Sequence, residues 1–169
     1  MTLQDHRTSV PYTGDERATL TAMLDFQRDT LALKCSGLTP DQLKARAVAP
    51  SALSLLGLVR HLAEVERGWF RNTLNGERSQ SPWTPPGSTD WADFDVDGAD
   101  VDEAFAIWRE ECARSRAIVA AAESLDVTGT HEGETYSVRY LLAHMIEEYA
   151  RHNGHADLLR ERLDGTTGE

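Results

Sequence analysis

The sequence has few cysteines, and those it has do not form a recognisable site. Cys35 and Cys112 are the only two among 169 residues. They lie in different segments and form no C-x-x-C pair. We therefore interpret each as a small buried apolar residue and not as a nucleophile.

Positive charge and long apolar runs are also scarce. Seventeen Lys and Arg against 28 Asp and Glu give a net charge of -11, which argues against a nucleic-acid partner. No basic amphipathic helix suggests a membrane surface, and no apolar run approaches a membrane span. Residues 1–16 lack the apolar core of a signal peptide, so we expect a cytoplasmic location. Arginine outnumbers lysine 15 to 2, a bias that resembles the product of a GC-rich bacterial genome.

Apolar residues repeat at helical spacing in four long segments. These cover residues 15–36, 51–75, 100–122 and 137–164. Asp15 and Ser137 are placed to cap the first and last, and Pro40 should open a short helical turn after the first. The length favours one domain over residues 1–169, with flexible tails at 1–14 and 165–169.

Two connections complete this expected organisation. Residues 77–100 are rich in Pro, Gly, Ser and Asp, and they carry Trp83, Trp91 and Phe94. A connection this long is a crossover that either covers a pocket or makes dimer contacts. A shorter loop contains a predicted hairpin around residues 132–133. The predicted fold is all-α, a four-helix bundle with one long crossover connection.

The last helix carries a concentrated set of metal-ligand side chains. At about 100° per residue, His144, Glu148, His152 and His155 fall within about 80° of arc on one helix face. Spacing alone does not choose among them. His144 with Glu148 and Glu148 with His152 are i,i+4 pairs, and His152 with His155 is an i,i+3 pair.

A metal site in a bundle needs a further donor from a facing helix. His61 lies in the middle of the second helix, next to its apolar stripe, and is the best candidate. His6 in the N-terminal tail and His131 in a loop rank lower. Two imidazoles, one carboxylate and an open position would suit a catalytic zinc, and also iron, nickel or manganese.

The sequence also allows a structural interpretation of one glycine and three arginines. Gly154 interrupts the last helix, which indicates close packing or room for a ligand. We interpret Arg60, Arg139 and Arg151 as members of surface salt bridges in preference to contacts with a substrate.

Two segments resemble a known family. Residues 60–70, RHLAEVERGWF, resemble the second-helix motif of the DinB-like metal-binding four-helix bundles. Residues 147–161, EEYARHNGHADLLRE, look like that family's last-helix motif. The form is similar to the actinobacterial branch that includes mycothiol-dependent maleylpyruvate isomerase and mycothiol S-transferases. Helix order extends the resemblance to most of the chain, but only these two segments are specific.

The resemblance implies a ligand set. Many members use three histidines, whereas the mycothiol-linked branch uses His, Glu, His, which maps onto His61, Glu148 and His152. His144 and His155 then become supporting or substrate-side residues. One divalent ion, zinc first, and mycothiol as thiol co-substrate are the implied cofactors, and a homodimer is expected from the resemblance alone.

Three functional hypotheses follow. The first is a thiol S-transferase that joins mycothiol to a small electrophile, which we prefer to an isomerase because the chain stops soon after the fourth helix. The second is a hydrolase that uses metal-activated water. The third is a non-catalytic metal-binding protein, in which His144 or His155 would close the site as a fourth ligand.

Overall fold

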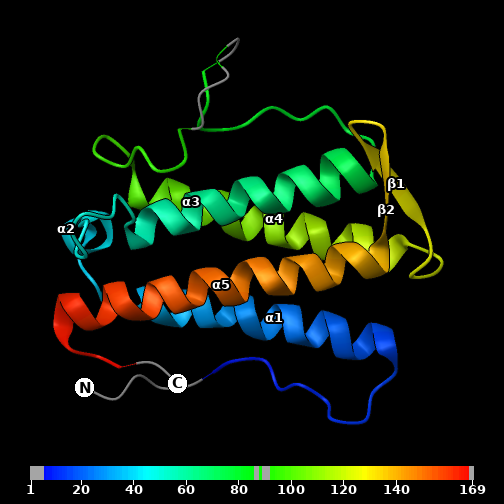
Figure 1. The fold of residues 1–169 in the computed structure, drawn as a ribbon, viewed down its shortest axis with the longest axis horizontal. Helices are drawn as coiled ribbons and strands as arrows, with labels where there is room; N and C mark the ends of the chain where they lie inside the picture. Colours follow the sequence, from blue (N-terminus) through cyan, green and yellow to red (C-terminus); the bar gives the residue numbers. More distant parts are fainter. Residues whose placement is uncertain (1–5, 86–87, 89–91, 168–169) are drawn as a thin grey trace. The chain divides into compact units, whose positions relative to one another are not determined.

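A computed structural model describes residues 6–85, 88 and 92–167, which are mostly helical (Figure 1). The elements are α1 (Glu16–Cys35), α2 (Pro40–Lys44), α3 (Leu55–Glu66), η1 (Arg67–Leu74), α4 (Val101–Ala121), β1 (Thr128–His131), β2 (Glu134–Ser137) and α5 (Val138–Asp164). This content is compatible with an all-α DinB-like bundle, and the predicted fold class is confirmed. Within the described ranges, no helix is both long and apolar enough to span a membrane.

Three of the predicted helix starts are confirmed by their capping bonds, whereas the second long helix begins at Leu55 and not at residue 51. The Asp15 side chain accepts a hydrogen bond from the first turn of α1. In α2, Thr39 and Gln42 form a reciprocal capping box. The Ser137 hydroxyl accepts a bond from the backbone N–H of Tyr140 at 3.1 Å and so caps α5. These bonds satisfy N–H groups that a helix start leaves without a partner.

The second helix differs from its prediction in how it ends. Its last eight residues, Arg67–Leu74, wind as a π-helix. The N–H of Asn75 donates to the Phe70 carbonyl at 3.0 Å, and the Thr73 hydroxyl donates to the Gly68 carbonyl at 3.0 Å. Apolar spacing over so few residues does not separate this wider winding from an α-helix, so the sequence could not show it.

The predicted hairpin is present and lies against η1. Glu132 and Gly133 turn the chain with positive φ angles of 51° and 86°. Gly129 in β1 lies so close to η1 that a Cβ there would be 2.0 Å from the Thr73 carbonyl oxygen. Trp69 also makes edge contacts with rings of the hairpin. A side chain at residue 129 would therefore push the hairpin away from η1.

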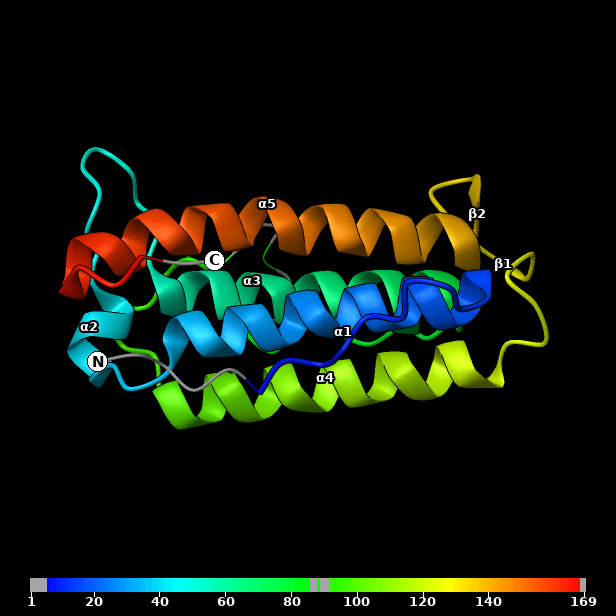
Figure 2. The same cartoon turned by 90° about the horizontal axis from the view of Figure 1, so that it is seen from below.

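The first of two compact units comprises residues 1–55 and 142–169. In it, α1 and α5 run side by side and parallel (Figures 1 and 2). The Asn153 amide donates to the backbone and side-chain oxygens of Gln27 at 3.0 and 2.8 Å. Arg160 donates to two carbonyls at the end of α1 at 2.9 and 2.7 Å. These bonds fix the register of the two helices.

The N-terminal segment contacts α1 where it is described. The Thr8 backbone N–H and hydroxyl both donate to the Asp29 carboxylate, at 2.8 and 2.6 Å. The Arg7 guanidinium lies 4.7 Å from the centre of the Phe26 ring. Residues 1–5 and 168–169 of the two predicted tails are outside the described residues, as is Trp91.

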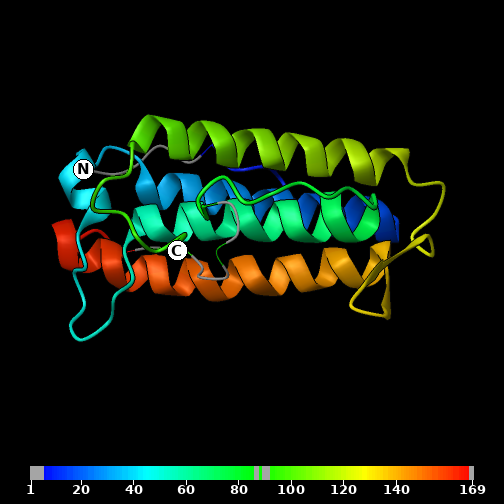
Figure 3. The ribbon, with the colours of Figure 1, turned by 90° about the horizontal axis from the view of Figure 1, so that it is seen from above.

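The second unit, residues 56–141, holds α3, η1, α4 and the hairpin. Arg71 of η1 forms an ion pair with Glu111 of α4 at 2.8 Å. The long connection returns along α3 (Figure 3). Near its start, the Arg67 and Asn72 side chains of η1 donate hydrogen bonds to the Ser79 carbonyl. The connection is therefore fastened to α3 and η1 within its own unit.

Both cysteines are free and buried, as the sequence predicted. Burial raises the pKa of the Cys35 thiol to about 12. The Cys112 thiol donates to the Glu66 carboxylate over 3.7 Å. A buried thiol with so high a pKa is not a nucleophile at neutral pH.

Candidate metal centre

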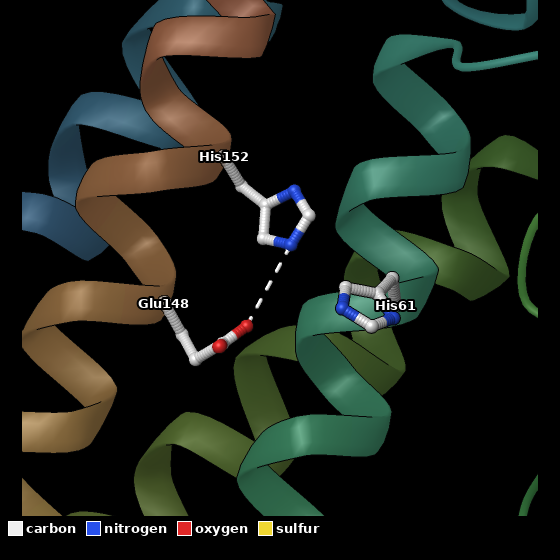
Figure 4. Close-up of side chains that lie close together, drawn as sticks. All are labelled: His61, Glu148 and His152. Carbon is white, nitrogen blue, oxygen red and sulfur yellow. Dashed lines mark ion pairs between the residues drawn. The ribbon is translucent and has the colours of Figure 1, made fainter.

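Two of the predicted ligands lie one turn apart on α5. The helix buries its apolar side with Leu141, Leu142, Met145 and Tyr149. Glu148 and His152 leave the same face of the helix because four residues make about one turn. His152 Nε2 is 3.7 Å from Glu148 Oε2 (Figure 4), and both side chains are largely shielded from solvent. The local helix alone therefore presents an imidazole and a carboxylate together.

The support for these two side chains also comes from α5. His155 Nδ1 is 3.3 Å from His152 Nδ1, so one of the two nitrogens donates to the other. Arg151 Nη1 is 3.6 Å from Glu148 Oε1, and its Nη2 pairs with Glu147 at 2.6 Å. Every one of these partners lies within four residues of the side chain it contacts.

The third predicted ligand, His61 on α3, is held from a distant part of the sequence. Its Nδ1 is 2.7 Å from Oδ2 of Asp93, a carboxylate that is only 2% exposed. The Phe94 ring stacks on the imidazole with centres 5.1 Å apart and planes 26° from parallel. An ionised carboxylate can only accept, so a hydrogen bond to ionised Asp93 requires the His61 tautomer that has its proton on Nδ1.

Arg60, the neighbour of His61, fastens the segment that carries Asp93. Its guanidinium donates to the Ala92 carbonyl at 2.9 Å and to the Asp95 carbonyl, on either side of Asp93. Its Cζ lies 4.5 Å from the centre of the Trp83 ring, and the Trp83 indole N–H donates to the Arg60 carbonyl. Arg60 is 6% exposed, so our interpretation of it as a surface salt bridge was wrong.

Burial also changes the titration of this guanidinium. It lowers the pKa of Arg60, and the Asp95 and Asp93 carboxylates oppose that shift. Arg60 is thus a buried cation whose counter-charges lie in the segment that it holds. Removal of the Arg60 cation or of these carboxylates would leave the remaining charge without compensation, which is energetically costly.

Other predictions for nearby residues can be judged as well. Arg139 pairs with Asp126, and Arg151 with Glu147, at partly exposed positions, as predicted. Gly154 is exposed, and a Cβ there would meet no side chain or other packed atom within 4 Å among the described residues. Of the two alternatives predicted for Gly154, close packing is therefore excluded, and room for a ligand stays a prediction.

His61, Glu148 and His152 form a group that could hold a metal ion (Figure 4). Each offers one ligand atom, so the group supplies two imidazole nitrogens and one carboxylate oxygen. This donor set fits zinc and other divalent transition metals. His144 is half-buried on α5 and is outside the group, and His155 contacts it through His152.

Asp93 is the residue that the sequence did not reveal. It lies in the long connection among several other acidic residues, and nothing in its spacing relates it to His61, 32 positions earlier. The aromatic residues of that connection were the available signal. They indicate that the segment packs against something, but not which donor it supports.

A comparison with protein-family models matches residues 19–165 to the mycothiol S-transferases. The chain belongs to this family. The DinB-like resemblance of the two helix motifs is thereby confirmed. A search of curated proteins gave no match. The matched range includes His61, Glu148 and His152.

Proposed function

We propose that the protein is a metal-dependent mycothiol S-transferase, with one divalent ion held by His61, Glu148 and His152. Zinc is our first choice, and nickel, iron and manganese share the same donor preferences. The observation that carries the proposal is the group of two imidazoles and one carboxylate, in a chain whose family transfers this thiol.

The charges of the donors favour a thiol as the bound substrate. Two neutral imidazoles and one carboxylate leave a divalent ion with one uncompensated positive charge. A bound divalent ion lowers the pKa of a thiol that coordinates it, so the thiol reacts as thiolate at neutral pH. The protein then needs no nucleophile of its own, in agreement with the high pKa of Cys35.

The proposed reaction is a substitution at an electrophilic carbon. The thiol loses its proton to solvent, and its sulfur forms a bond to that carbon. The leaving group departs with the electron pair of the bond that breaks. In this scheme His61, Glu148 and His152 position the reaction, while His155 and Arg151 hold the α5 donors in place.

The test is thiol conjugation followed by absorbance, with mycothiol and chlorodinitrobenzene as substrates. We expect a rate above the uncatalysed reaction, which a chelator abolishes and added zinc restores. The His152→Ala variant should stay inactive after zinc is added. Mycothiol consumption that continues unchanged in chelator would contradict metal dependence.

The same assay separates the alternatives. Release of a hydrolysed product without mycothiol would indicate a metal-activated-water hydrolase instead. Tightly bound metal with neither activity would indicate a non-catalytic metal protein. The cytoplasmic location and the homodimer stay predictions.

A further inference from the structure

We propose that Asp93 is a positioning residue that fixes the tautomer and orientation of His61, and that Arg60 holds Asp93 in place for this task. This inference rests on the proposed function, because it assigns His61 Nε2 as the metal-binding nitrogen. It adds to the site a carboxylate from the long connection, which neither the family match nor the sequence motifs assign.

The first argument is the hydrogen bond itself. At 2.7 Å between His61 Nδ1 and Asp93 Oδ2, the contact has the length of a charge-assisted bond. A neutral histidine has two tautomers, and only the one protonated on Nδ1 can donate to this carboxylate. The lone pair is then on Nε2, the ring nitrogen that points away from Asp93. Metal-binding histidines are commonly oriented by such a carboxylate.

The second argument is the burial of Asp93. Its side chain is 2% exposed, and its Oδ1 is buried without a hydrogen-bond partner among the described residues. Burial of a carboxylate is costly unless charge nearby compensates it. Arg60 supplies one positive charge through its Coulomb interaction with Asp93. A metal ion bound to His61 would supply further positive charge. A purely structural hydrogen bond to a neutral histidine would not need a buried charge.

The third argument is how the segment is held. Arg60 bonds the carbonyls of residues 92 and 95, so the backbone on both sides of Asp93 is fixed. Phe94 stacks on the His61 ring and restricts its rotation. Arg60 thus holds the backbone of the connection around Asp93, and Asp93 and Phe94 in turn orient the neighbouring His61. Such mutual support holds a ligand in place before the metal arrives.

The experiment compares three variants with the wild-type protein. Asp93→Ala removes the acceptor, and Asp93→Asn keeps the shape and an acceptor oxygen but removes the charge. Asp97→Asn is the matched control, because it removes one exposed carboxylate of the same connection that is not among the carboxylates acting on Arg60. Zinc affinity is measured by competition with a chromophoric chelator. The imidazole nitrogens of His61 are observed by NMR in the metal-free protein.

We expect Asp93→Ala to bind zinc about 10–100-fold more weakly, the usual effect of losing a partner behind a metal ligand. Asp93→Asn should lie between that variant and the wild type. Asp97→Asn should stay within about twofold of the wild type, since exposed charges contribute little. In metal-free wild-type protein, the proton of His61 should be on Nδ1, and in Asp93→Ala the Nε2–H form should increase.

Two results would overturn the inference. One is an unchanged His61 tautomer in metal-free Asp93→Ala, and the other is wild-type zinc affinity in that variant. If Asp93→Ala does not fold, Asp93→Asn decides by the same two measurements. A wild-type protein that binds neither zinc nor nickel, iron or manganese would end the proposed function, but the tautomer would still show whether Asp93 orients His61.

Discussion

The donors on α5 and the donor on α3 are held in different ways. Glu148 and His152 are one turn apart, and they contact Arg151 and His155, which lie within four residues of them. His61 depends on Asp93, 32 residues later in the chain. A regular helix fixes the first pair by its own geometry. The second arrangement needs a long connection to return to its helix and be fastened there.

This difference predicts which substitutions would disturb the donors on α5 and which would disturb the donor on α3. On α5, a substitution acts on the side chain that it removes, because the helix keeps the others in place. For the α3 donor, a substitution in the connection can disturb His61 although the two lie far apart in the sequence. Four changes would sharpen or break this comparison.

The largest effect should come from the ligands themselves. His61→Ala, Glu148→Gln and His152→Ala should each weaken zinc binding by more than the ~10–100-fold expected for a supporting residue. Conjugation activity should fall to the uncatalysed rate in all three. His144→Ala removes an imidazole from the same helix but outside the group, and it should keep its zinc affinity. Equal losses in His144→Ala would break the assignment of the α5 donors.

The next effect should come from Arg60. Arg60→Met keeps a long side chain but removes the bonds to the carbonyls of residues 92 and 95. We expect zinc affinity to fall about tenfold, at the lower end for outer partners, since the residue acts through Asp93. Arg109→Met is the control, because Arg109 is exposed on α4. Wild-type affinity in Arg60→Met would show that the connection holds itself without this anchor.

A change at the hairpin should lower stability but not metal binding. Gly129→Ala places a Cβ against the Thr73 carbonyl, and overpacking of this kind costs about 1–3 kcal/mol. Thermal unfolding should show a lower Tm, whereas Gly98→Ala, where a Cβ meets nothing within 4 Å, should show little change. Weaker zinc binding by folded Gly129→Ala would mean that His61 is supported through η1 as well as through Asp93.

The smallest effect should come from Gly154 on α5. A Cβ there meets no packed atom, so Gly154→Ala should stabilise the helix by up to about 1 kcal/mol. The Tm should rise by a few degrees, and conjugation activity should not change. A loss of activity would show that a substrate occupies the space beside Gly154.

The two regions also differ in how far the sequence could predict them. The α5 donors follow from spacing, and the helix starts at Asp15, Thr39 and Ser137 follow from capping residues. Selection of Glu148 with His152 needed the family resemblance, since three pairs had suitable spacing. Asp93 and the buried role of Arg60 depend on a tertiary contact between segments far apart in sequence, which no local pattern encodes.

The π-helix η1 escaped prediction for another reason. Its winding differs from that of an α-helix by about one residue per turn, and eight residues are too few to show the difference in apolar spacing. Gly129 and the Thr73 hydroxyl take part in contacts that accompany this winding, and each looks ordinary in the sequence.

The metal content of untagged protein tests the central claim most directly. Elemental analysis should find one divalent ion per chain in the wild-type protein and almost none in His152→Ala, with His144→Ala retaining its ion. Full retention of the ion in His152→Ala would contradict the assignment of His61, Glu148 and His152 as the metal ligands.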